Sequence, residues 1–186
     1  MKQLIRAYAG AVFVVMVVAG AMPLSVPKGW AQAQQKTAIS FQVSAENTKY
    51  TQQHALDVGD MPGHQIRIFE IHRIYPKDPP LFAGVPTKES WVRAVTDNLG
   101  DDGHVVGYVV YAMQNGDKIY GRYEGTAQGT GEQPSGRRHV SGNTIFTGGT
   151  GKFRAIRGVL HNTNLAEPAK GFNESRTEGV YWMEKE

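Results

Sequence analysis

The 186-residue sequence contains no cysteine, and this absence excludes several kinds of site. Without cysteine there is no disulfide, no thiolate metal ligand, no thiol nucleophile and no lipidated cysteine. The fold must therefore be held by its own apolar core. The roughly 150 residues that follow the N-terminal leader described below are enough to build one.

The sequence also lacks net charge once that leader is set aside. The whole chain has 20 basic and 17 acidic residues. Lys2, Arg6 and Lys28 all belong to the leader, which contains no acid, so the rest carries equal numbers of both signs. Because no basic run is longer than Arg137-Arg138, we expect no nucleic-acid partner.

The leader has the three-part layout of a secretory signal peptide. A positive start is followed by an apolar run from Ala7 to Ala21 and by a small-x-small site at Ala31-Gln32-Ala33. We expect residues 1–33 to be a signal peptide, the mature protein to be periplasmic or secreted, and no membrane attachment after cleavage. The alternative is an uncleaved anchor, because the uncharged stretch from Ala7 to Pro27 is about long enough to span a bilayer.

The remaining sequence reads as strands, with no long amphipathic helix pattern. Gln65–Tyr75 is rich in β-branched and aromatic residues, which is typical of a strand. His104–Met113 and Lys118–Gln128 flank Asn115-Gly116, a two-residue hairpin signal. Further strands are expected at 137–146, 158–164 and 177–184. Many short strands with regular turns predict an all-β, antiparallel barrel or sandwich.

Two segments fit this pattern less well. Residues 34–64 are expected to be an N-terminal extension with room for one strand near Ile39, and residues 65–186 to be the β-barrel domain. Within that domain, Pro76–Gly103 contains four prolines and predicts a long loop with a short helical turn near Glu89.

The segment Thr147–Phe153 has three glycines in four positions between two apolar runs. It is not a phosphate-binding loop, since Phe146 stands where a Walker motif needs glycine, and Arg154 stands where a dinucleotide fingerprint needs a small residue. Glycines in this setting favour a tight turn or a close backbone approach. We expect a structural role, with Phe153 packed beneath the turn and Gly158 easing the chain into the next strand.

These residues resemble a known signature. Phe146–Phe153, followed by Gly158, is similar to the Gly-Gly-(Ser/Thr)-Gly-x-Phe motif of the allene oxide cyclase and dirigent barrels. Phe69-Glu70-Ile71-His72 resembles the cyclase segment aromatic-Glu-Ile-Asn, whose Glu and Asn point into the cavity; His72 departs from that pattern. Over residues 65–184 the resemblance implies an antiparallel barrel with a mostly apolar interior for a small molecule, and relatives of this kind often form trimers.

Strand alternation places Glu70 and His72 on the face that also carries Ile66, Ile68 and Ile74. Three isoleucines make this face the better core candidate. A carboxylate in an apolar cavity has a raised pKa and can act as a general acid or base beside an imidazole. We therefore expect Glu70 and His72 to be catalytic. The alternatives are that the other face is inward and this pair is solvated, or that the pair is buried and only satisfies itself.

The remaining ligand-binding candidates are Ile66 and Ile68 on this strand, Tyr108 on the next and Arg122 beyond it. A tyrosine facing inward can hydrogen-bond a ligand oxygen. For Arg122 a solvated outer face with cross-strand ion pairs is the competing interpretation.

No metal site is expected, because the six histidines form no close cluster with carboxylates, and no cofactor is implied. The sequence predicts an exported barrel that binds a small, largely apolar, oxygen-bearing molecule. The enzymatic version of this hypothesis is a cofactor-free isomerase or cyclase that works by holding its substrate in the reactive conformation. The alternatives are a non-catalytic carrier barrel and a structural homotrimeric module.

Overall fold

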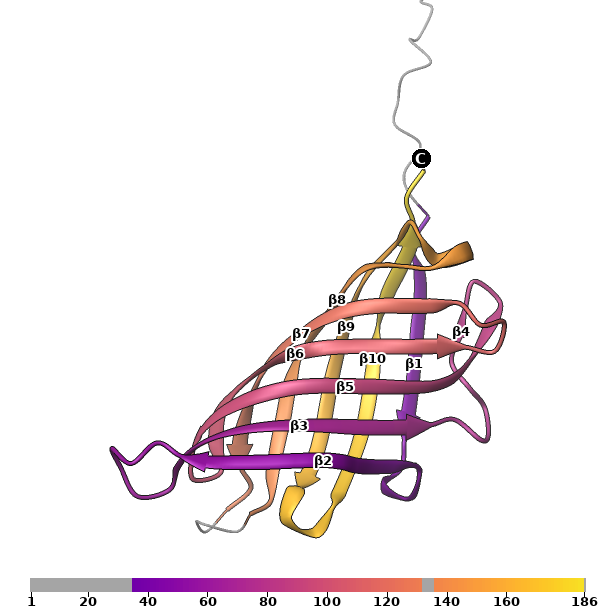
Figure 1. The fold of residues 1–186 in the computed structure, drawn as a ribbon. Coiled ribbons are helices and arrows are strands. Elements are labelled where there is room, and N and C mark those ends of the chain that lie inside the picture. Colours follow the sequence, from indigo (N-terminus) through magenta and orange to yellow (C-terminus); the bar gives the residue numbers. More distant parts are fainter. Residues whose placement is uncertain (1–34, 132–135, 186) are drawn as a thin grey trace, which may run out of the picture. The chain divides into compact units, whose positions relative to one another are not determined.

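The computed structural model describes residues 35–131 and 136–185, and the expected signal peptide lies outside them. Ten strands and three short 3-10 turns make up this part of the chain (Figure 1). The strands are β1 Thr37–Val43, β2 Thr48–Asp57, β3 His64–Ile74, β4 Leu81–Phe82, β5 Val85–Leu99, β6 Asp102–Met113, β7 Lys118–Gly129, β8 Arg138–Gly149, β9 Ile156–Glu167 and β10 Phe172–Met183. The turns are η1 Ala45–Asn47, η2 Gly151–Phe153 and η3 Pro168–Lys170. The all-β, antiparallel prediction is confirmed.

Within the described residues the strands form one antiparallel sheet in the order β1-β10-β9-β8-β7-β6-β5-β3-β2, and β4 pairs only with β5. The sheet curls so that β2 and β3 run across β9 and β10 (Figure 1). Its outermost strands, β1 and β2, are not hydrogen-bonded to each other, so the expected closed barrel is an open, barrel-like sheet. We call the gap between β2 and the β1–β10 pair the seam.

Side chains, not backbone ladders, bridge the seam. Asn173 Nδ2 donates to the Tyr50 hydroxyl at 3.3 Å. Gln53 Nε2 donates to the Pro168 carbonyl at 3.2 Å. The two edges of the sheet are therefore joined by isolated hydrogen bonds.

One end of the sheet's interior is a dense apolar core. Phe82 is fully buried there and lies 5.6 Å from Phe146 and 5.3 Å from Tyr181 between ring centroids. The hairpin between β4 and β5 turns through Ala83 and Gly84, which both have positive φ as a type I′ turn requires. This hairpin carries Phe82 into the core and closes that end.

The glycine segment has the predicted structural role. Phe153 is fully buried. Gly151 has φ +47° and packs against the Asp117 carboxylate, where a side chain would not fit. Asp117 Oδ2 also accepts a hydrogen bond from the Lys152 amide at 3.2 Å. The turn thus locks β8 onto the β6–β7 hairpin.

Two expectations about segments are wrong. The predicted loop at 76–103 contains β4 and the 15-residue β5, the longest strand of the described chain. Its prolines gather at one end, and Pro86 lies at the second position of β5. The alternation after it was hidden because its inward positions include polar residues, such as Thr96 and Asn98. The N-terminal extension also contributes two strands to the sheet, β1 and β2, where one was allowed for.

Candidate functional site

The face of β3 that we expected to point inward points outward. Ile68 is 56% exposed, and Ile66 and Ile74 are also exposed. Arg67 and Arg73 line the interior instead, together with Phe69, Ile71 and Tyr75. The isoleucines identified the wrong face because the opposite face carries two aromatic rings and an isoleucine, and is equally able to form a core.

Glu70 therefore lies on the outer surface. Its carboxylate accepts a hydrogen bond from Thr51 Oγ1 at 2.7 Å and forms an ion pair with Arg93 Nε at 2.7 Å. The Thr51 hydrogen bond is the main cause that lowers the pKa of Glu70; Arg93 adds to it and desolvation opposes it. This is the reverse of the raised pKa expected for a carboxylate in an apolar cavity.

His72 has its own partners on the same surface. Its Nε2 lies 2.9 Å from Glu89 Oε2, and its ring stacks on Trp91 with centroids 4.0 Å apart. Glu70 and His72 are thus each engaged with β5 or β2. Their predicted catalytic roles have no support from this placement.

The predicted ligand-binding residues also lie outside. Tyr108 is 62% exposed, and Arg122 is exposed beside it. Together with Ile68 they line an outer hollow of about 890 Å³. Ile66 lies further along the same face of β3. The solvated interpretation of Arg122 is the correct one.

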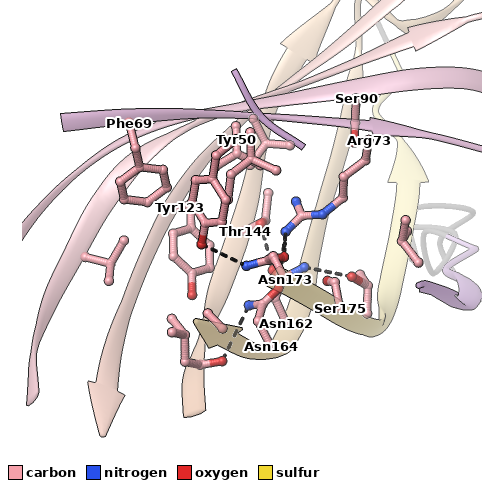
Figure 2. A pocket seen from close by; sticks show the side chains of 18 of the residues that line it. Tyr50, Phe69, Arg73, Ser90, Tyr123, Thr144, Asn162, Asn164, Asn173 and Ser175 are labelled. Carbon is pink, nitrogen blue, oxygen red and sulfur yellow. Dashed lines mark hydrogen bonds between the residues drawn. The ribbon is translucent and has the colours of Figure 1, made fainter. Parts of the chain in front are cut away.

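The interior holds a cavity of about 80 Å³ next to the apolar core (Figure 2). Its apolar walls include Val105, Val109 and Ala127, and its polar walls come from β3, β8, β9 and β10. This volume accommodates a few water molecules, each of which occupies about 30 Å³ in the liquid. It is smaller than the roughly 300 Å³ at the lower end for drug-sized ligands.

Arg73 is the central polar residue of the cavity. Its Nη2 donates to Asn173 Oδ1 at 2.8 Å and to Asn164 Oδ1 at 3.3 Å (Figure 2). Its Nε is buried and has no hydrogen-bond partner among the described residues. Asn173 in turn reaches Tyr50 across the seam.

Two further arginines line the cavity. Arg67 Nη2 donates to Gln53 Oε1 at 2.6 Å. Burial lowers the pKa of Arg67, and the positive charge of Arg138 lowers it further. Arg138 Nη2 lies 3.3 Å from the buried Asp101 carboxylate, while its Nε is buried without a partner in the described part of the chain.

Neutral side chains complete the polar wall. Thr144 Oγ1 donates to Asn162 Oδ1 at 2.8 Å, and Asn162 Nδ2 donates to Thr177 Oγ1 at 2.9 Å. The Tyr123 hydroxyl is buried without a partner among described residues, and burial raises the pKa of Tyr123 to about 12. Burial also raises the pKa of Tyr50. Both phenols are therefore protonated at neutral pH and can donate hydrogen bonds.

The arginines, amides and hydroxyls that line this cavity are groups that can bind and orient a ligand. Of the described residues that line it, none is an Asp, Glu, His or Lys. General acid–base catalysis by a group with a pKa near 7 has no candidate there. Sequence reasoning missed Arg67 and Arg73 because arginine in a strand usually faces solvent. The available signal was their alternation with Phe69, Ile71 and Tyr75.

The described residues contain no group of three or more His, Asp or Glu side chains placed to hold a metal ion. No helix in residues 35–131 or 136–185 is long and apolar enough to cross a bilayer.

Comparisons with known proteins give a fold likeness and no close relative. No family model matches the chain, and no curated protein matches it. Among solved structures, the pterocarpan synthase dirigent protein GePTS1 is similar at 13% identity, with 90% of this chain and all of that chain covered and a TM-score of 0.46. A second one, PsPTS1, is similar at 9% identity, with 83% and 98% covered and a TM-score of 0.42. A likeness at this level says nothing about the family, the ligand or the activity of this chain.

Proposed function

We propose that this protein is a small-molecule-binding protein that holds an oxygen-bearing ligand inside its curled sheet. The observation that carries the proposal is the set of buried donors without partners around one cavity, Arg73 Nε, Arg138 Nε and the Tyr123 hydroxyl. Buried polar groups are normally paired, and leaving one unpaired costs about 1–3 kcal/mol. A ligand oxygen would supply the missing acceptor.

The apolar half of the cavity supports the same proposal. Val105, Val109 and Ala127 give it a hydrophobic wall opposite the arginines. A pocket with apolar walls and a few converging polar groups is the usual form of a small-molecule site. Because the cavity is about 80 Å³, the ligand is small or enters as one end of a longer molecule.

The test compares a substitution that fills the cavity with a substitution on the outer surface. Purified protein is extracted with organic solvent, and the extract is analysed by mass spectrometry. We expect the wild type and Thr126→Phe, an outward neighbour, to release the same bound molecule, and Ala127→Phe to release none. Equal extracts from Ala127→Phe and the wild type, or no bound molecule in the wild type, would contradict the proposal.

The isomerase or cyclase function stays a prediction, and its Glu70–His72 version has a direct test. Since Glu70 lies outside the cavity and is held by Thr51 and Arg93, we expect Glu70→Gln to leave ligand content unchanged. If Glu70→Gln abolishes turnover of an identified substrate while binding persists, catalysis at the outer face would be shown.

We further propose that the protein associates with copies of itself through its outer face. Support comes from exposed apolar side chains on β3, β5, β6 and β8, namely Ile68, Val95, Val106, Tyr108 and Ile145, with Arg122 and Glu124 of β7 between the last two strands. Exposed apolar side chains with polar residues among them are typical of interaction sites. Sedimentation velocity should show an oligomer for the wild type and a monomer for Ile68→Asp. A monomeric wild type would contradict self-association.

Export remains a proposal supported by the leader alone. We expect a mature N-terminus at Gln34, with cleavage after Ala33. N-terminal sequencing of the protein from a periplasmic or secreted fraction checks this. An intact Met1 on the exported protein would favour the anchor.

A further inference from the structure

The cavity has a surplus of positive charge. Three arginines line it, Arg67, Arg73 and Arg138, and no carboxylate does so among the described residues. Asp101 stands behind Arg138 as the acid paired with it. Arg73 and Arg67 are held by Asn164, Asn173 and Gln53, which accept hydrogen bonds but carry no charge.

The three arginines line one cavity and have a common neighbour, Tyr50. Arg138 acts electrostatically on Arg67, and all three arginines act on the phenol of Tyr50. Like charges gathered in a partly desolvated cavity repel one another, and a buried charge without a counter-charge is unfavourable. A negative charge placed among them would relieve both costs.

The unused donors are of the type that binds oxyanions. Arg73 and Arg138 each keep a buried Nε–H without a partner in the described chain. Guanidinium N–H groups form short, charge-assisted hydrogen bonds to carboxylate oxygens, and the planar arrangement suits a two-oxygen acceptor. Tyr123 adds a third free donor on the wall that leads to Val105 and Val109.

We infer that the cavity binds a small organic carboxylate, with its oxyanion between Arg67, Arg73 and Arg138 and its carbon chain toward Val105 and Val109. This inference rests on the proposed binding function and specifies the charge of the ligand. A cavity of about 80 Å³ admits the carboxylate and a short chain. The neighbouring outer-face arginine, Arg93, has its own carboxylate in Glu70 and takes no part.

The experiment compares propionate with propionamide, which has nearly the same shape and no charge. Melting temperature and isothermal titration are measured at low ionic strength. We expect propionate to bind and raise the melting temperature of the wild type, and propionamide to bind roughly tenfold or more weakly, because hydrogen bonds to a charged acceptor are the stronger ones. Binding of inorganic phosphate is measured in the same way, to distinguish a site for any oxyanion from a site for an organic acid.

Matched variants locate the site. Arg73→Gln should weaken propionate binding roughly tenfold or more, while Arg93→Gln on the outer face should leave it unchanged. Arg67→Gln serves if Arg73→Gln does not fold, because it removes one hydrogen bond, to Gln53, where Arg73→Gln removes two. Without ligand, Arg67→Gln should melt at or above the wild-type temperature, since it removes repulsion.

Several results would overturn the inference. Equal binding of propionate and propionamide, each lost in Ala127→Phe, would leave the proposed binding function standing and remove the charge requirement. Stronger binding of phosphate than of propionate would show that the site does not require an organic chain on its ligand. An equal loss in Arg93→Gln and Arg73→Gln would show a surface effect. Failure of the binding function itself looks different, because Ala127→Phe would then respond to propionate as the wild type does.

Discussion

The two faces of β3 carry the reverse of what their positions would suggest: the outward face carries exposed isoleucines and the inward face carries two arginines. The outward face carries Ile66 and Ile68, both exposed, while the inward face carries Arg67, which donates to Gln53, and Arg73, which donates to Asn173. A sheet with one buried face normally has apolar residues inside and polar residues outside. Here the inward arginines line the cavity and the outward isoleucines leave an apolar surface.

The inner face of the sheet thus has two zones that differ in polarity and packing. Around Phe82 the interior is dry and densely packed, and this zone supplies stability. Around Arg73 it is polar and has unpaired donors. A strand that crosses the second zone therefore does not show the ordinary alternation of apolar and polar residues, although one of its faces points into the interior.

The largest effect should come from the dry zone. Phe82→Ala removes a fully buried ring from a cluster with Tyr111, Phe146 and Tyr181. We expect it to lower the free energy of unfolding by about 3–5 kcal/mol, the usual cost for a buried aromatic ring. Chemical denaturation measures this, and Leu81→Ala, at an exposed neighbour, is the control. A loss below about 1 kcal/mol for Phe82→Ala would mean that this zone does not carry the stability.

The polar zone should respond more weakly. Thr144→Val keeps the shape of the side chain but removes the donor to Asn162 Oδ1. We expect a loss of about 1–3 kcal/mol in the free energy of unfolding, because a buried acceptor is left unpaired. Thr126→Val, exposed on the outer face, should change it by less than about 0.5 kcal/mol. Equal effects at the two positions would remove the distinction between the faces.

The smallest effect is expected on the outer face, at the start of β3. His64 contacts Asp97 at 2.8 Å and Asp60 at 2.6 Å. The hydrogen bond to Asp97 is the main cause that raises the pKa of His64, and the bond to Asp60 adds to it. The stabilisation is therefore complete below the unfolded-state pKa of about 6.5 and is lost as pH rises through the higher folded-state pKa.

An NMR titration of His64 checks this prediction. Its pKa should lie above that of a free histidine, and Asp97→Asn should lower it more than Asp60→Asn does. Because these groups are exposed, added salt should shrink the shift. A pKa at or below the free value would contradict the assignment.

Much of the fold was predictable from local patterns. The hairpin at Asn115-Gly116 and the glycine turn above Phe153 were found because their backbone chemistry is specific. β5 was missed because the prolines at its start indicated a loop and its inward Thr96 and Asn98 interrupted the apolar pattern. Whether the sheet closes could not be predicted, since β1 and β2 are adjacent in sequence but pair with distant and near strands respectively, β10 and β3, and so become the two opposite edges of the sheet.

The site was harder to predict than the fold for the same physical reason. Choosing the inner face of β3 by its isoleucines assumed that the interior is apolar. The interior around Arg73 is polar because Asn164 and Asn173 come from β9 and β10, about a hundred residues away in sequence. No local pattern contains that information.

The seam gives the molecule a weak line that a closed sheet would not have. Two side-chain hydrogen bonds hold it in the described structure, Asn173 to Tyr50 and Gln53 to Pro168. Bonds of this kind contribute about 1 kcal/mol each. Asn173 also holds Arg73, and Gln53 also holds Arg67. The seam bonds use the amide nitrogens of Asn173 and Gln53, whereas the amide oxygens of the same residues accept from Arg73 and Arg67. The proposed anion would compete with these two oxygens for the arginine donors, so that occupancy of the cavity and opening of the seam would be linked.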